Sequence, residues 1–164
     1  MVARMANLLR ELSDAWAREG DSPPARAALS GWAIARPEVA RFPSPAHLVR
    51  AAHSRADVAA QHLIDDLTEH AAVDPWAART VLQAVLPGLA RLTRDHIDMV
   101  GTGHEPFADI GELDQFLLCT AFERITVIAA EVPAFRLRSL LDSTWSRLAP
   151  TPPPIVATGT TVCP

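Results

Sequence analysis

The chain has 164 residues, of which 49% are hydrophobic and 21% charged, the size and composition of one globular domain with a substantial core. Its formal net charge of -4 argues against a protein that coats nucleic acid with a generally basic surface. Two cysteines cannot build a disulfide framework, and no window approaches the roughly 18 apolar residues of a membrane span. We therefore expect a soluble, cytoplasmic protein that does not bind membranes.

The first two helices are predicted from apolar spacing and from cap residues. Residues 2–19 repeat apolar positions at helical intervals and stop at Gly20, a favoured residue at helix ends. Ser22 stands before two prolines, a typical N-cap followed by a first turn, and predicts a second helix over residues 25–35.

Prolines then interrupt the chain. Pro37, Pro43 and Pro45 predict a loop with at most one helical turn inside it. Ser44 is placed to cap a third helix that ends near residue 53. A fourth helix is predicted from residue 54 to about residue 73, with Asp57 in its first turn.

Three longer helical patterns follow. Asp74 and Pro75 form a strong start signal for a fifth helix, in which Pro87 predicts a kink or a break. Asp109 and Glu112 resemble a capping box at the start of a sixth helix over residues 111–130. A seventh helix is predicted over residues 134–148.

The chain shows neither strand alternation nor an internal repeat, and helix-favouring Ala and Leu dominate it. The predicted fold class is all-α, an orthogonal bundle of about seven helices with a disordered, Pro-rich tail. We divide the chain into an N-terminal helical region (1–73), a second helical domain (74–149) and a flexible tail (150–164).

One helix face invites a metal hypothesis. Three potential ligands follow at four-residue steps on the predicted fourth helix: His62, Asp66 and His70. This spacing is compatible with binding of a transition metal. Two turns of one helix cannot bring three ligands to one point, and no cysteine joins them. We interpret this face as a solvated polar surface and expect no metal.

Signals of catalysis are weak. Cys119 falls inside the sixth helical pattern, where we expect a buried and inert thiol. Gly101 and Gly103 lack the preceding strand of a dinucleotide-binding loop and predict a plain turn. We expect a protein without enzymatic activity, without a cofactor and without a small-molecule substrate.

The charges separate along the last three helices. Acidic residues gather in the loop and the sixth helix, and arginines stand with Phe135 and Trp145 in the seventh. An acidic face favours a basic partner, and arginines beside exposed aromatics can hold phosphates and stack on unpaired bases. The alternative is that the aromatics belong to the core and the arginines to the solvated surface.

These residues carry a resemblance to a known family. Residues 74–89, DPWAARTVLQAVLPGL, are similar to the first helix of region 2 in the sigma-70 family of bacterial transcription initiation factors, especially the sigma-like proteins of actinobacteria. Residues 112–125, ELDQFLLCTAFERI, resemble the acidic-then-aromatic helix with which sigma factors bind the clamp helices of RNA polymerase. Residues 133–147 correspond in position to the helix that melts and reads promoter DNA.

The resemblance implies a non-catalytic, transcription-associated protein that binds the RNA polymerase core and, secondarily, promoter DNA. The residues it assigns to polymerase binding are Glu112, Asp114, Gln115 and Glu123, and those it assigns to DNA binding are Arg136, Arg138, Trp145 and Arg147. The alternative is a helical protein-interaction module, a degenerate sigma-like or regulatory accessory protein, that does not bind DNA.

Overall fold

A computed structural model describes residues 8–54, 56–97, 100, 107–128, 141, 142, 144 and 146. Within these residues the protein is all-α, and the pairing outside helices is an isolated bridge between Val100 and Phe107. The α-helices of the described residues are α1 (Leu8–Glu19), α2 (Pro23–Ala35), α3 (Pro45–Ala52), α4 (Val58–Thr68), α5 (Pro75–Asp95) and α6 (Ile110–Glu123). A 3-10 helix η2 (Pro37–Arg41) and a π-helical turn η4 (Arg124–Ile128) complete them.

Most helices begin where the cap residues predict. The Ser22 and Ser44 hydroxyls each accept a hydrogen bond from a first-turn backbone N–H, in α2 and α3. At α6 the Asp109 carboxylate accepts from the Glu112 N–H at 2.9 Å. The Glu112 carboxylate in turn accepts from the Ala108 N–H at 2.7 Å, so the predicted capping box is confirmed with a shift of one residue.

The prediction for α4 was wrong at both ends. Asp57 is its N-cap and accepts from the Ala60 N–H at 2.9 Å, so the helix begins at Val58 and not at residue 54. After Thr68 the backbone changes to hydrogen bonds three residues back, as between the Ala71 N–H and the Thr68 carbonyl. This tighter turn ends the α-helix five residues before the predicted position at residue 73.

The helix α5 runs through Pro87 without a break, in contrast to the predicted possibility of two pieces. The proline removes the hydrogen bond that its N–H would give to the Gln83 carbonyl. Buried Val85, Leu86 and Leu89 on both sides of Pro87 hold the helix in place. One turn before Pro87, the His53 ring meets the Ala84 carbonyl through Nε2 at 3.1 Å, which makes Nε2 the protonated ring nitrogen.

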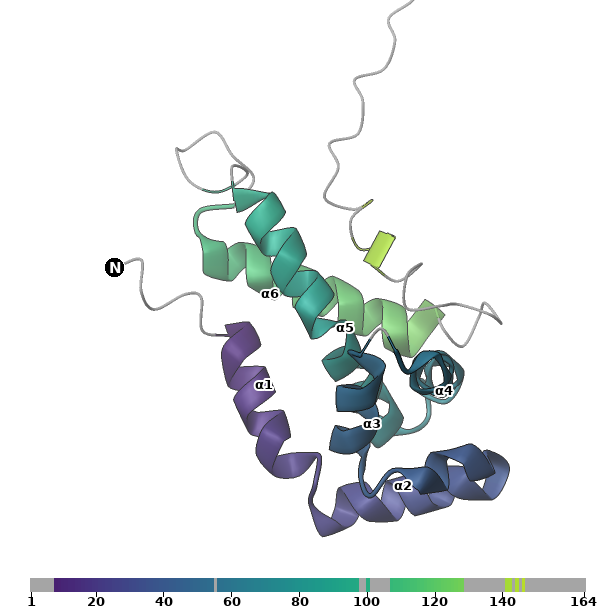
Figure 1. Ribbon diagram of the computed structural model, residues 1–164. Helices are drawn as coiled ribbons and strands as arrows, with labels where there is room; N and C mark the ends of the chain where they lie inside the picture. The colour runs from purple at the N-terminus through teal and green to yellow at the C-terminus, as the bar shows by residue number, and fades with distance from the viewer. Residues whose placement is uncertain are drawn as a thin grey trace, which may run out of the picture.

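One hydrophobic core joins α1 to α6. Figure 1 shows α5 in the middle of the molecule, crossing α6, with α1 on the left and α2 below. Asp74 caps α5 through one carboxylate oxygen and accepts a hydrogen bond from Trp32 Nε1 of α2 at 2.6 Å through the other. The predicted boundary at residue 73 therefore lies between two helices that pack on each other, α4 and α5.

The predicted seventh helix and the tail lie mostly outside the described residues. Within 134–148, Leu141, Asp142, Thr144 and Ser146 are helical, and Thr144 is fully buried. A Cβ added to Gly88 of α5 would lie 2.6 Å from Leu141 Cδ1, so Leu141 packs closely on α5 at Gly88 and would have to move for a larger residue. In the described part of the chain no helix is long and apolar enough to cross a membrane.

Candidate functional site

An exposed face of α6 carries three of the four residues expected to bind polymerase. At 3.6 residues per turn, Glu112, Gln115 and Glu123 fall within about a quarter of the helix circumference. All three are exposed, and so are Cys119 inside this arc and Phe122 at its edge, the latter by 45%. We call these five residues the α6 face. The structure brings together acidic, polar and aromatic side chains there.

The fourth residue, Asp114, lies elsewhere. Its position two residues after Glu112 turns it to the opposite side of α6, where it is only 2% exposed. There it meets the Thr93 hydroxyl of α5 at 2.6 Å between Oδ1 and Oγ1. The sequence spacing alone indicates that Asp114 and Glu112 lie on different sides of α6, because residues two apart never share a helix face.

Burial raises the pKa of the Asp114 carboxyl above its ordinary value of 3.8, and the hydrogen bond with Thr93 offsets part of this rise. Thr93 Oγ1 also lies 3.3 Å from the Leu89 carbonyl, but a hydroxyl has a single proton to donate. The Thr93 hydroxyl donates this proton to Asp114 Oδ1 at 2.6 Å, the shorter of the two contacts. This hydrogen bond favours the charged carboxylate, whereas burial favours the neutral acid and has the larger effect on the pKa.

The expectation of a buried Cys119 was wrong. The thiol is free and exposed, because Cys119 stands on the α6 face, two turns after Glu112, while its neighbours Leu117, Leu118 and Ala121 fill the core side. The residues expected to bind DNA, Arg136, Arg138, Trp145 and Arg147, lie outside the described residues.

The histidine face of α4 does not form as predicted. His70 lies beyond the end of α4 at Thr68, so it cannot continue the four-residue steps of His62 and Asp66. Asp66 instead pairs with Arg36 Nε of α2 at 3.4 Å. Among the residues that the structure describes, no group of three or more His, Cys, Asp or Glu could hold a metal ion.

A serine, a histidine and an aspartate meet between α1 and α3. Ser44 Oγ donates to Asp21, and His47 Nδ1 lies 2.9 Å from Ser44 Oγ and 3.3 Å from Asp21 Oδ1. The hydrogen bond from Ser44 is the main cause that lowers the pKa of Asp21. A nucleophilic triad needs both ring nitrogens, one for the serine and one for the carboxylate. Here one nitrogen meets both, and Ser44 is fully buried, so the cluster is a helix cap.

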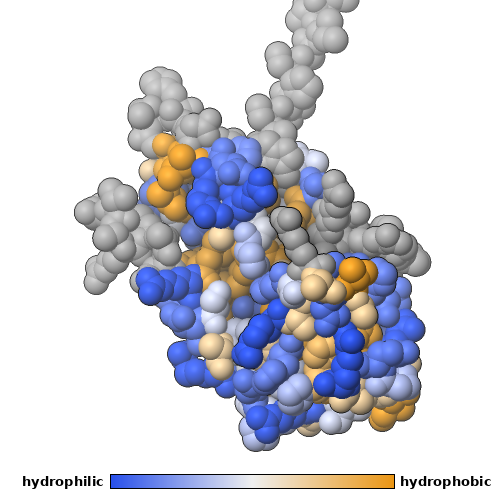
Figure 2. All heavy atoms as spheres, viewed as in Figure 1, coloured by the Kyte–Doolittle hydropathy of each residue, from blue (hydrophilic) through white to orange (hydrophobic). Residues whose placement is uncertain are grey.

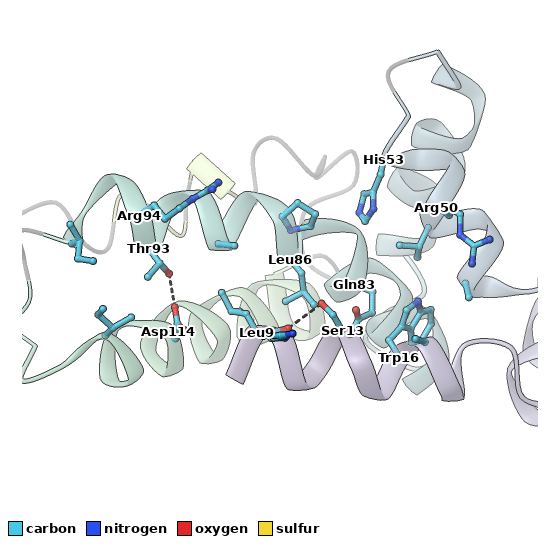
Figure 3. A pocket seen from close by; sticks show the side chains of 18 residues that line it. Leu9, Ser13, Trp16, Arg50, His53, Gln83, Leu86, Thr93, Arg94 and Asp114 are labelled. Carbon is cyan, nitrogen blue, oxygen red and sulfur yellow. Dashed lines mark hydrogen bonds between the residues drawn. The ribbon is translucent and has the colours of Figure 1, made fainter. Parts of the chain in front are cut away.

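A cavity of about 770 Å³ lies between α1 and α5 and was not foreseen from the sequence. Figure 3 shows α1 along one side and α5 along the other, with Arg50, His53 and Trp16 at one end and the Thr93–Asp114 pair at the other. Helical periodicity tells which residues face inward but not how far two helices stand apart. Such a cavity therefore leaves no signal in a single sequence.

No protein-family model, curated protein or solved structure matches the chain. The fold and the geometry define a helical protein with an exposed polar face on α6 and an apolar cavity beside α1.

Proposed function

We propose that this protein is a non-catalytic, transcription-associated protein that binds the RNA polymerase core through the α6 face. The observation that carries the proposal is the presence of Glu112, Gln115 and Glu123 together on one exposed helix face, with Phe122 at its edge. Aromatic side chains are enriched in protein interfaces, and acidic side chains around them complement a basic partner. The partner's identity rests on the resemblance to sigma region 2.

Asp114 has a structural part in this proposal and makes no direct contact with polymerase. It fixes α6 to α5 through Thr93, and the capping box at Asp109 fixes the first turn of α6. The partner would therefore meet a helix whose N-terminal half is already held in place, which lowers the entropy lost on binding.

DNA binding is the second element of the proposal, supported by the resemblance of residues 133–147 to the helix that melts and reads promoter DNA. The competing function is a protein-interaction module without DNA binding. A salt-dependent interaction with a fork-junction promoter probe, lost in Arg136→Ala together with Arg138→Ala, supports promoter contact. An identical interaction of the double variant and the unchanged chain favours the module.

The polymerase contact is tested by co-purification of the chain with purified core RNA polymerase. We expect Gln115→Arg and Glu123→Arg, combined, to reduce the bound fraction roughly tenfold, because two cations would then face a basic surface. Glu38→Arg is the matched control, since Glu38 is exposed on η2, away from α6. The control should bind like the unchanged chain.

Glu112 is left in place because its carboxylate holds the α6 cap, and its reversal would mix a folding effect with a binding effect. Loss of binding in the control to the same extent, or full retention in the Gln115 and Glu123 variant, would contradict the proposal.

A further inference from the structure

The cavity between α1 and α5 has mainly apolar walls. They are formed by side chains from α1, α3 and α5 and by the two isoleucines that stand at the end of α5 and the start of α6. The apolar residues along it are Leu9, Trp16, Val49, Leu86, Ile97 and Ile110. Figure 2 shows orange, apolar surface set back beside the blue surface of α1. A volume of about 770 Å³ falls in the range of small-molecule sites, roughly 300 to 1,000 Å³.

The charge around this cavity is opposite to that of the whole chain. Arg10 of α1, Arg50 of α3 and Arg94 of α5 line it, against one acidic residue, Asp114, whereas the chain has a formal net charge of -4. All three arginines are exposed. None of them forms an ion pair with a described acidic residue. These guanidinium groups can therefore take an external anion without breaking an internal contact.

The two ends of the cavity differ. At the α5–α6 end Asp114 stands beside Thr93, and a carboxylate there would repel an anion. Arg50 and Trp16 line the same end of the cavity, the α3 end (Figure 3). Trp16 is 6% exposed, and its Nε1 is a buried donor without a hydrogen-bond partner among the described residues. A buried donor without a protein partner is uncommon, and an oxygen of a bound ligand could accept a hydrogen bond from it.

From this arrangement we propose that the cavity binds an amphipathic small molecule with a carboxylate group, whose negative end lies at Arg50 and Trp16 and whose aliphatic body lies between α1 and α5. The ligand would be bound and not converted. The terminal segments 1–7 and 147–164 contain no acidic side chain, so neither supplies this negative group from its side chains. The proposal does not rest on polymerase binding.

The test is a calorimetric titration of the full chain with dodecanoate, kept below its micelle concentration, and with dodecanol as the uncharged probe of equal length. We expect saturable binding of dodecanoate and binding of dodecanol that is at least tenfold weaker, because the alcohol cannot form a charge-assisted hydrogen bond with a guanidinium group. A third arm with dodecyl phosphate distinguishes a preference for carboxylate from a general preference for anions.

Two substitutions locate the site. Arg50→Gln should weaken dodecanoate binding about tenfold, and Ala90→Leu should weaken it by filling the wall of α5 while it keeps helix propensity. Arg18→Gln is the matched control: Arg18 is an exposed arginine of α1 that does not line the cavity. It should leave the affinity within about twofold.

Several results would overturn the proposal: no saturable binding of dodecanoate, equal affinity for dodecanol, or equal affinity of the unchanged chain and Arg50→Gln. Binding to phosphatidylglycerol vesicles without binding of free dodecanoate would overturn it as well, because the cationic surface would then serve a membrane. Circular dichroism melting of each variant verifies that the fold is retained, so a loss of affinity reports on the cavity.

Discussion

At the scale of single residues, Asp114 illustrates how burial decides what a carboxyl group can do. The group is 2% exposed and lies against Thr93, and burial is the main cause that raises its pKa above 3.8. Between that value and its raised pKa, the unfolded chain has released the proton while the folded chain still holds it. The free energy of unfolding therefore falls as the pH rises through this interval.

We predict that Asp114→Asn removes this fall, because an amide keeps the shape of the carboxyl and an oxygen that accepts from Thr93 but does not ionise. Thermal unfolding from about pH 4 to about pH 8 measures the effect. The variant should gain stability relative to the unchanged chain as the pH rises. Asp21 and Asp57, whose pKa values are lowered below 3.8, are present in both proteins, so their contribution cancels in the difference. Parallel stability curves would show that Asp114 ionises freely in the folded protein.

At the scale of one element, α5 runs through Pro87 and packs closely on Leu141 at Gly88. A glycine inside a helix normally destabilises it by about 0.5 to 1 kcal/mol relative to alanine. An alanine at position 88 would remove this cost, but its Cβ would lie 2.6 Å from Leu141 Cδ1. The gain in helix propensity is therefore opposed by a steric clash. Gly31 of α2 offers the comparison, since a Cβ there would meet nothing within 4 Å.

Gly31→Ala should therefore stabilise the protein by about 0.5 to 1 kcal/mol, whereas Gly88→Ala should gain less or lose stability. Chemical denaturation of both variants gives the difference. In a Leu141→Ala background the obstruction is absent, and Gly88→Ala should then gain as much as Gly31→Ala. If the two glycine variants already agree in the presence of Leu141, the close approach at Gly88 has no energetic consequence.

At the scale of the whole molecule, the residues at the start of α5 connect the two helical regions predicted from the sequence, residues 1–73 and 74–149. Asp74 joins α2 to α5 through Trp32. The Trp76 and Trp16 rings lie 6.5 Å apart between centroids, and Arg79 pairs with Glu19 of α1. The start of α5 thus holds α1 and α2 against the rest of the helix bundle.

Asp74→Ala should destabilise the protein by about 2 kcal/mol, from the lost cap and from the Trp32 indole N–H left without an acceptor. Asp74→Asn should cost less, because its amide oxygen retains the cap while its NH₂ group faces the indole N–H. Urea denaturation of both variants, repeated in a Trp32→Phe background, separates the two contributions. With Phe at position 32, Asp74→Asn should leave the free energy of unfolding almost unchanged. If the variant is still destabilised in that background, the loss of stability comes from the cap and not from the contact with Trp32.

Local features of this fold were predictable and distant ones were not. The caps are local, because each side chain accepts a hydrogen bond from a backbone N–H three residues further along, and the sequence around the helix start is enough to recognise them. This holds for Ser22, Ser44 and Asp109. The burial of Asp114 and the exposure of Cys119 depend on which side of α6 meets α5. The cavity depends on how far α1 stands from α5, a distance set by side chains such as Trp16 that contact residues far along the chain.

The exposed thiol of Cys119 allows a chemical probe to be attached selectively to the α6 face. All 15 basic residues are arginine, so no lysine side chain reacts with amine-directed reagents, and the second cysteine, Cys163, can be replaced by serine. A maleimide photocrosslinker attached to Cys119 would then sit between Gln115 and Phe122, at the centre of the surface assigned to the partner. Illumination would join that surface covalently to the macromolecule that covers it.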